Sequence, residues 1–379
     1  MDRIYFDYNS SAPCRSDVSA RMEEVSRGIF GNPSSAHREG RAARAVVAAA
    51  REEIAAAIGA RPGEIVFTSG GTEADHLAIV GVWRASAAAH PHIVTSKIEH
   101  DAVRNACRAA ESAGVRVSYA SCDAEGVVDA RTVEAILDED VILVSLMHAN
   151  NETGVIQPVR EVAARARGRG ILAHTDAVQS LGKIPVRVDE LGVDLLSLSG
   201  HKIGGPKGVG ALYVREGTRL EPVLVGGPQE SGRRAGTENV AGIAGLAAAV
   251  TTAVREQAAE AERLGVLKRR LWDGLRERVV AVAVNGSFAN STANTLNVSF
   301  EGAGGEGLMM ALDDEGIAVS TGAACAVGGG EPSHVLEAMC LGRDRCRGAI
   351  RFSMGKGTTA EQIERALEII PRAVARLRA

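Results

Sequence analysis

The feature that most constrains the fold is an alternation of short apolar segments with helix-like segments between residues 64 and 198. The apolar segments, which lack the every-second-residue polar pattern of a half-exposed strand, are 64–68, 92–96, 115–120, 141–147, 170–175 and 193–198. Strands that are apolar on both faces are typical of parallel sheets covered by helices on both sides. The sequence therefore predicts an α/β fold with a mostly parallel central sheet, whose ligands bind at the carboxyl ends of the strands.

The pattern changes from about residue 241. A long helical region, 240–280, is followed by expected strands and helices at 281–284, 295–300, 306–314, 317–319, 349–353 and 360–377. We interpret this βαβ-like set as a second, smaller α/β domain, because a chain of 379 residues exceeds what one simple core accommodates. We expect a large domain at 17–255 and a small domain formed by 1–16 and 256–379.

Composition excludes several classes of function. A net charge of −4 gives no electrostatic reason to expect nucleic acid or an anionic membrane as the main partner. We expect no secretory signal at the N-terminus, and the most apolar stretch, 241–254, is too short to span a bilayer. Six cysteines without CxxC pairs argue against a disulfide framework or a metal site. These features together predict a cytoplasmic protein.

Two strand ends carry residues suited to a cofactor. The segment 199–202 reads Ser-Gly-His-Lys directly after an apolar strand, and Asp176 ends another apolar strand upstream. A lysine can form an imine with an aldehyde cofactor, and an acid can keep a pyridine nitrogen protonated. An isolated motif of this kind would more simply be a surface lysine in a polar turn. Lys202 and Asp176 together favour a site for pyridoxal 5'-phosphate (PLP).

Two further candidates lie at the start of expected helices. The turn 69–73, with Gly71 and Thr72, opens a helix whose free N–H groups could bind a phosphate. The alternative is a plain turn in which Thr72 caps the helix; the neighbouring PLP lysine makes the phosphate site the better interpretation. His100 either caps the helix at 101–113, lies buried, or stacks on the pyridine and moves protons.

Other polar residues interrupt apolar surroundings. The run 148–152 ends a strongly apolar strand, so we expect at least one of its side chains to form hydrogen bonds. Gln179 could donate to the phenolic oxygen of the cofactor, or could simply be solvent-exposed. Arg351 lies within the apolar strand 349–353 and needs an anionic partner. Its forked guanidinium suits a substrate carboxylate, and a structural salt bridge is the alternative.

Cys325 lies in a segment of small residues and glycines, 320–330. Such a composition is typical of a loop, where a cysteine is exposed and reactive rather than packed. The alternative is a fortuitous loop thiol, which we disfavour because exposed free cysteines are a liability. The other five cysteines lie in or beside apolar or helical runs and receive no functional interpretation.

Taken together, these residues resemble the cysteine desulfurases, the NifS/IscS-type enzymes of the class V aminotransferase family. The resemblance runs from about Tyr5 to the last helix and rests on the segments 31–37, 65–73, 147–154, 176–180, 199–202, 234–239 and 350–353. It implies the PLP-dependent transferase fold type I, PLP as cofactor and L-cysteine as substrate. It also implies a homodimer.

The resemblance further implies a role for each matching residue. Lys202 would form the Schiff base, Cys325 would be the nucleophile, and His100 would stack on the ring and act as acid and base. The implied cofactor-binding set is Gly71, Thr72, His100, Asn151, Asp176, Gln179, Ser199, His201, Lys202 and Thr237, of which Thr237 comes from the second subunit. The implied substrate-binding set is Asn32, Asn151 and Arg351.

The implied reaction removes sulfur from L-cysteine and gives L-alanine and a persulfide on Cys325. The sulfur then passes to an acceptor protein, whose identity the sequence does not indicate, for iron–sulfur cluster assembly or thiolation. Selenocysteine lyase activity is a close alternative, because it uses the same cofactor chemistry. An aminotransferase or another PLP-dependent lyase of the same fold is a weaker one, since it has no use for Cys325. A catalytically silent binding protein would conflict with the intact set of reactive residues.

Overall fold

The computed structural model describes residues 3–321 and 332–379. Its centre is a seven-stranded sheet with the strand order β2-β8-β7-β6-β5-β3-β4. The strands are β2 (Ile65–Thr68), β3 (His92–Ser96), β4 (Arg116–Ala120), β5 (Val141–Ser145), β6 (Leu172–Asp176), β7 (Leu195–Ser199) and β8 (Gly210–Val214). All neighbouring pairs are parallel except those of β8, which is antiparallel to β2 and to β7. The predicted mostly parallel sheet is confirmed, whereas β8 was not predicted.

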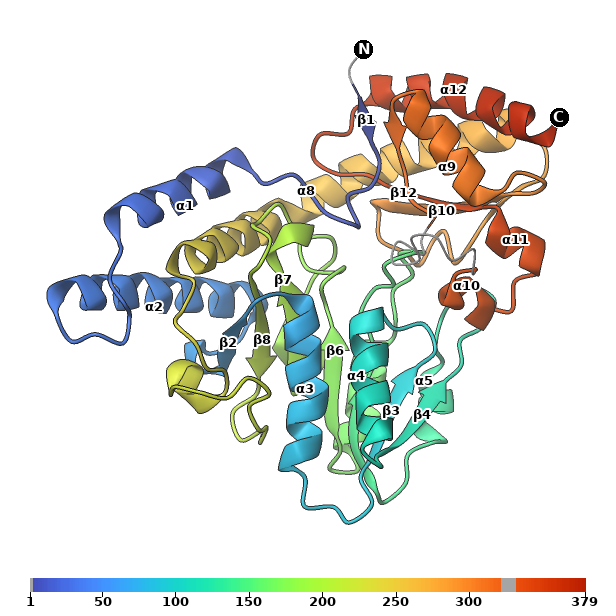
Figure 1. The fold of residues 1–379 in the computed structure, drawn as a ribbon. Helices are drawn as coiled ribbons and strands as arrows, with labels where there is room; N and C mark the ends of the chain where they lie inside the picture. The colour runs from blue at the N-terminus through green and yellow to red at the C-terminus, as the bar shows by residue number, and fades with distance from the viewer. Residues whose placement is uncertain (1–2, 322–331) are drawn as a thin grey trace.

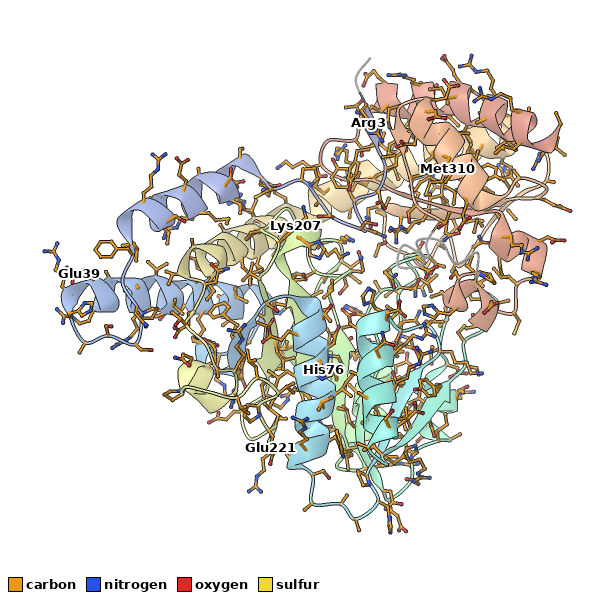
Figure 2. All side chains as sticks on the ribbon, viewed as in Figure 1. Arg3, Glu39, His76, Lys207, Glu221 and Met310 are labelled. Carbon is orange, nitrogen blue, oxygen red and sulfur yellow. The ribbon has the colours of Figure 1, made fainter. Side chains whose placement is uncertain are left out.

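Apart from the edge strand β4, which is largely half-buried, the central sheet is buried on both faces, as expected for strands without regular polar alternation. On β2, Val66 belongs to a core on the side of α3 (Gly71–Ala85) and α4 (Asp101–Ser112). Its neighbours Ile65 and Phe67 belong to the core on the other side, with α2 (Arg38–Ile58) and α6 (Val159–Arg167). Charged side chains such as Glu39 on α2 lie on the outside of these layers (Figure 2).

A local sequence signal ends helix α2. The helix stops where Gly59 adopts a left-handed conformation with φ of 73°, which glycine tolerates without steric cost.

The N-terminal helix α1 (Ser16–Gly28) and α2 both pack against the long helix α8 (Val240–Arg278). The remaining helical segments of this part are η1 (Pro62–Glu64), α5 (Ala130–Glu134), α7 (Val188–Leu191), η2 (Gly200–Lys202) and η3 (Gln229–Gly232).

The second unit lies beyond the carboxyl ends of the parallel strands (Figure 1). It contains a three-stranded sheet, β12-β10-β9, and a two-stranded sheet, β1-β11. Its elements are β1 (Ile4–Tyr5), β9 (Val282–Val284), β10 (Thr295–Phe300), α9 (Gly305–Asp314), β11 (Ile317–Ala318), α10 (His334–Ala338), α11 (Arg343–Arg347), β12 (Ala349–Ser353) and α12 (Ala360–Arg378). Its larger sheet is antiparallel, whereas β1 and β11 pair parallel.

Helix α8 connects the two units and contributes to both cores (Figure 1). Its first half places Leu246 and Val250 in the core of the central sheet. Its second half places Leu271 and Leu275 against the small sheet. The predicted domain boundary at residue 255 falls inside this helix and stays a prediction. Within 3–321 and 332–379, no helix is both long and apolar enough to cross a membrane.

Candidate active site

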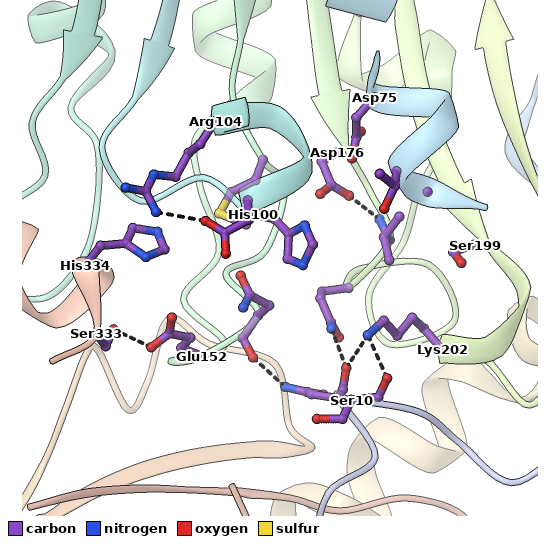
Figure 3. Close-up of a pocket in the computed structure, with 18 of the residues that line it drawn as sticks. Ser10, Asp75, His100, Arg104, Glu152, Asp176, Ser199, Lys202, Ser333 and His334 are labelled. Carbon is purple, nitrogen blue, oxygen red and sulfur yellow. Dashed lines mark hydrogen bonds and ion pairs between the residues drawn. The ribbon is translucent and has the colours of Figure 1, made fainter. Parts of the chain in front are cut away.

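A cavity of about 670 Å³ lies between the carboxyl ends of the central strands and the second unit (Figure 3). It is lined mainly by polar residues from both units and from the N-terminal segment. They are Asn9, Ser10, Gly71, Thr72, Asp75, His100, Asp101, Arg104, Arg108, Met147, Asn151, Glu152, Asp176, Val178, Gln179, Ser199, His201, Lys202, Pro332, Ser333, His334, Glu337 and Arg351.

Most of the predicted site residues meet in this cavity: Gly71, Thr72, His100, Asn151, Asp176, Gln179, Ser199, His201, Lys202 and Arg351. Three do not. Asn32 is exposed in the turn before α2, where its Oδ1 accepts a hydrogen bond from the Ser34 N–H at 2.9 Å. Thr237 is exposed in the segment before α8. Cys325 lies outside the described residues. The roles of all three stay predictions.

Lys202 is delivered to the cavity by the turn that follows β7. The turn needs glycine at position 200, because a Cβ there would lie 2.9 Å from the Pro206 carbonyl oxygen. The Lys202 ammonium donates to the backbone oxygens of Asn9 at 2.7 Å and Ser10 at 2.9 Å (Figure 3). The reactive amine is therefore held against the N-terminal segment, at the wall of the cavity.

Asp176 is the last residue of β6 and is 5% exposed. One of its carboxylate oxygens accepts a hydrogen bond from the Val178 N–H at 2.8 Å. Burial raises the pKa of Asp176, and the positive charges of His100 and Lys202 oppose that rise. A carboxyl group in this position can hold a protonated ring nitrogen, because a buried anion favours a cationic partner.

A second buried carboxyl group, Asp75, was missed by the sequence analysis. It lies on α3, is 1% exposed and lines the cavity. Burial raises the pKa of Asp75 well above its ordinary value, and the negative charge of Asp176 raises it further. Its Oδ1 has no hydrogen-bond partner among the described residues, and the His174 Nε2 lies 3.6 Å away. The available signal was an acid within the apolar run of α3.

His100 is the N-cap residue of α4, so the capping interpretation is correct, and its side chain also lines the cavity. Its Nδ1 accepts a hydrogen bond from the Ala102 N–H at 3.1 Å. In the neutral ring, the proton must then be carried by Nε2. The site thus contains an imidazole whose tautomer is set by the helix that it caps.

The N-terminus of α3 is open toward an anion. The N-cap residue is Gly70, and no side chain caps the helix, so the alternative that Thr72 is the cap is wrong. A Cβ on Gly71 would lie 2.7 Å from a methyl carbon of Val178, so only glycine fits there. Free N–H groups of a helix N-terminus are a favourable binding site for a phosphate.

His201 lines the same cavity. Burial, with the positive charge of Lys202, lowers the pKa of His201 to about 4.

Arg351 on β12 is 2% exposed and extends to the cavity wall. Its Nη1 donates to the Asn151 backbone oxygen at 3.0 Å, and its Nη2 donates to Asp7 at 2.8 Å and Ser10 Oγ at 2.7 Å. The salt bridge left open as an alternative therefore exists. However, the Arg351 Nε and the Asn151 Oδ1 are buried without partners among the described residues. These two atoms remain available to a ligand.

Gln179 is buried, so simple solvent exposure is wrong. Its Nε2 donates to the Asn9 backbone oxygen at 2.9 Å, and its Oε1 accepts from the Lys183 ammonium at 2.6 Å. Neither Asn9 nor Lys183 was singled out from the sequence. The only signal for Asn9 was the polar run that follows the short N-terminal strand.

The polar run after β5 forms the hydrogen bonds that its sequence predicts. His148 Nδ1 lies 3.0 Å from Ser180 Oγ, and burial lowers the pKa of His148 to about 4.

Glu152, in the same run, accepts a hydrogen bond from the Ser333 hydroxyl, and Ser333 lies just after residues 322–331, which the structure does not describe. Near the first end of that stretch, the Arg351 N–H donates to the Ser320 backbone oxygen at 2.6 Å. Both flanks of the stretch that contains Cys325 are thus anchored at the cavity.

Comparisons with known proteins agree with this arrangement. The profile of the class-V aminotransferase family matches residues 4–366. Cysteine desulfurase IscS of Dictyoglomus turgidum is 46% identical over 375 residues, which cover 99% of this chain and 95% of that protein. The solved structure of a NifS-like protein has a TM-score of 0.93 at 38% identity and covers 99% of this chain and 100% of that chain.

A further solved structure, SspA in complex with cysteine, has a TM-score of 0.82 at 36% identity and covers 93% of this chain and 98% of that chain. The family profile spans nearly the whole sequence, and the curated relative has almost the same length. The chain belongs to the class-V aminotransferase family and, within it, to the cysteine desulfurases.

Proposed function

We propose that this chain uses PLP to remove sulfur from L-cysteine, giving L-alanine and a persulfide on Cys325. The observation that carries the proposal is the placement of Lys202 and Asp176 in one cavity, beside the uncapped N-terminus of α3. An amine, a buried acid and an anion site are the three features that an aldehyde–pyridine–phosphate cofactor requires.

The residues present fit PLP. Gly71 lets Val178 pack closely against the start of α3, and the N–H groups of that uncapped helix end suit a phosphate. Lys202 would hold the aldehyde carbon, Asp176 the ring nitrogen and Gln179 the phenolic oxygen, with His100 stacked on the ring. The phosphate would be held by Gly71, Thr72, Ser199 and His201 together with Thr237 of the partner subunit. When bound, PLP supplies a sink for the electron pair released at the substrate Cα.

Arg351 and Asn151 are proposed to bind the carboxylate of the amino acid substrate. Among the described residues, the Arg351 Nε and the side-chain amide oxygen of Asn151 are buried without partners, so both side chains have hydrogen-bonding capacity left for a ligand. Asn32, which lies outside this chain's cavity, stays a predicted substrate residue. Two orphaned polar atoms on one wall are costly unless a ligand satisfies them.

His100 and Lys202 are proposed to move protons. The helix cap engages the His100 Nδ1, so Nε2 is the ring nitrogen that can give and take a proton. The Cys325 thiolate attacks the substrate sulfur, so an S–S bond forms while the substrate Cβ–Sγ bond breaks. The substrate carbon takes up protons and leaves as alanine, so that one thiol and one cysteine give one persulfide and one alanine.

We further propose a cytoplasmic homodimer that passes its sulfur to an acceptor protein, for iron–sulfur cluster assembly or thiolation. Exposed apolar side chains support an interface between copies: Phe30 is 81% exposed and Val225 is 76% exposed. A groove is lined by residues of the segment 33–34, of α2 and of the segment 228–238. Asn32 directly precedes the first of these segments, and Thr237 lies within the last. A second subunit seated there would bring both residues into a shared site.

The test is the visible spectrum of purified protein with PLP, before and after L-cysteine, with sulfide and alanine measured in the same tube under reducing conditions. We expect a yellow protein that releases equal sulfide and alanine. Cys325→Ala should lose sulfide release, whereas Cys14→Ala, a change of an exposed cysteine elsewhere, should retain it. A protein that stays colourless would refute the PLP site.

Two outcomes would favour the alternative activities. Selenocysteine turnover that survives in Cys325→Ser, while cysteine turnover is lost, would assign selenocysteine lyase activity as well. Amino-group transfer to a keto acid without sulfide release would favour an aminotransferase.

A further inference from the structure

Lys183 is a partly buried lysine beside the cavity that the proposed chemistry does not use. It does not line the cavity itself. Its ammonium donates to the Gln179 Oε1 at 2.6 Å and to the Asn9 Oδ1 at 3.0 Å. Both acceptors are neutral amides, and neither contact is an ion pair. A lysine directed at two amide oxygens is well placed to determine how those amides are turned.

The two ends of an amide side chain have nearly the same shape and differ in hydrogen bonding, because the NH₂ group donates and the oxygen accepts. A lysine ammonium has N–H donors and no acceptor, so the atom that faces Lys183 is an oxygen. This fixes the Gln179 Oε1 toward Lys183 and leaves the Gln179 Nε2 for the opposite side. There, Nε2 donates to the Asn9 backbone oxygen, which also accepts from Lys202. The amide end on the Lys202 side is therefore a donor.

Asn9 is oriented in the same way. Its Oδ1 accepts from Lys183 and from the Asn294 Nδ2 at 2.9 Å. Its Nδ2 then faces the second unit and donates to the Asn151 backbone oxygen at 3.1 Å and to Thr295 Oγ1 at 2.9 Å. One lysine thus sets two amides, and those amides contact residues of both units.

We propose that Lys183 is a positioning residue that fixes the Gln179 amide so that its N–H group, and not its oxygen, is presented to the phenolic oxygen of the cofactor. The inference rests on the proposed function, in which Gln179 holds that oxygen. A phenolic oxygen that carries negative charge is bound by a donor and repelled by an acceptor. If the Gln179 amide were turned by half a rotation, its oxygen would face the phenolic oxygen, and the two would repel each other.

Burial lowers the pKa of Lys183 well below its ordinary value, and the positive charges of Lys202 and Arg351 lower it further. In either charge state Lys183 keeps at least two N–H groups, one for each of its two acceptors, and only the ammonium lacks a lone pair that could accept from an amide N–H.

The chain contains a matched control for the substitution. Lys268 on α8 is 4% exposed and also donates to two oxygens, Ser291 Oγ at 2.7 Å and the Thr292 backbone oxygen at 3.1 Å. It belongs to the second unit and does not line the cavity. Lys268→Met removes the same kind of contact as Lys183→Met, without any link to Gln179.

The experiment titrates PLP into the apoproteins of the wild type, Lys183→Met and Lys268→Met. It records the PLP dissociation constant, the visible absorption maximum of the loaded protein and the pH at which that absorption changes. We expect Lys183→Met to weaken PLP binding about tenfold, the value of one hydrogen bond to a charged group, and to shift the absorption and its pH dependence. Lys268→Met should change none of these, although it lowers the thermal midpoint of the apoprotein.

A double-substitution cycle tests whether Lys183 acts through Gln179. In a Gln179→Leu background, Lys183→Met should have no further effect on PLP affinity or spectrum, because the amide proposed to face the phenolic oxygen is absent, while Asn9 does not hold that oxygen in the proposal. Effects that simply add would overturn the proposal. Lys183→Gln, which keeps an N–H₂ donor, serves if the methionine variant fails to fold. It should lie closer to the wild type.

Two different results distinguish a failure of the proposed function from a failure of the role of Lys183. A wild-type protein that never binds PLP refutes the proposed function. A wild type that binds PLP and releases sulfide, while Lys183→Met matches Lys268→Met in affinity and spectrum, refutes only the role of Lys183.

Discussion

Replacing Arg351 with lysine should weaken the binding of the substrate carboxylate while leaving a positive charge in place. Among the described residues, the two terminal nitrogens of Arg351 are engaged by Asn151, Asp7 and Ser10, whereas its Nε has no partner. A carboxylate can therefore pair with Nε and share a neighbouring terminal N–H in a fork. Lysine has one nitrogen, so it cannot serve Asp7 and present a fork at the same time.

The size of the effect follows from the loss of one charge-assisted hydrogen bond. Such a bond contributes about 1.5–3 kcal/mol, which corresponds to about 10- to 150-fold in affinity. We expect Arg351→Lys to lower kcat/KM for L-cysteine by a factor in that range, mainly through a higher KM. The substitution also weakens the contact with Asp7, so a fall in stability is expected alongside.

Inhibition by the product separates these two consequences. L-Alanine carries the carboxylate, and its methyl ester does not. For the wild type, the ester should inhibit more weakly than the acid; for Arg351→Lys, that difference should shrink by the same 10- to 150-fold factor. A general loss of stability would weaken both inhibitors equally. An acid-to-ester ratio that is unchanged by the substitution would therefore refute a carboxylate site at Arg351 and leave only its structural salt bridge.

Three further substitutions test buried groups. Asp75→Asn should stabilise the apoprotein at neutral pH, because a buried carboxyl group with a raised pKa loses a proton on unfolding and so destabilises the fold as the pH rises. In denaturant titrations, the free energy of unfolding gained by the variant should grow by up to about 1.4 kcal/mol per pH unit from pH ~4 up to the raised pKa of the folded protein. His148→Gln should flatten the loss of stability on acidification between pH 6.5 and about 4, since the wild-type histidine is protonated only on unfolding there; the slope should fall by up to about 1.4 kcal/mol per pH unit. Ser333→Ala removes the hydroxyl that contacts Glu152 and accepts from two N–H groups of α10; hydrogen exchange there should quicken as about 1–2 kcal/mol is lost.

The central sheet and the ends of its strands were predictable because their signals are local. The parallel strands are short, mainly apolar segments without regular polar alternation, and the polar residues that follow them lie at one edge of the sheet. Six strands and the meeting of Lys202, Asp176 and His100 followed from this pattern alone. The motifs added the family and the activity, and relatives of similar length confirm both.

Strand pairing was less predictable than strand position. Strand β8 reads Gly-Ala-Leu-Tyr-Val, an apolar run like the others, yet it runs antiparallel between β2 and β7. In the small sheet, helices separate β10 from β12 in the sequence, yet these two strands pair antiparallel. Hydrophobic periodicity reports which faces are buried and carries no information on the direction of the neighbouring strand.

The residues that were missed act over long sequence separations. Lys183 follows Gln179 by one helical turn and would ordinarily be read as a solvated lysine. Its significance depends on Asn9, which no local pattern brings near it. Asp75 likewise matters only because the carboxyl end of β6 places Asp176 beside it. Such groups become visible only when the chain's distant segments are placed together.

The N-terminal segment shows why stability and site geometry are coupled in this protein. The backbone oxygen of Asn9 accepts from Lys202 and Gln179 of the central unit, while its side chain donates to Thr295 of the second unit. The same residue therefore joins the two units and orients two groups at the cavity. A change that loosens the contacts of Asn9 with the second unit should also alter how those groups are held, because one residue makes both sets of contacts. The polar run 7–10 is accordingly part of the site, although it precedes every strand of the central sheet.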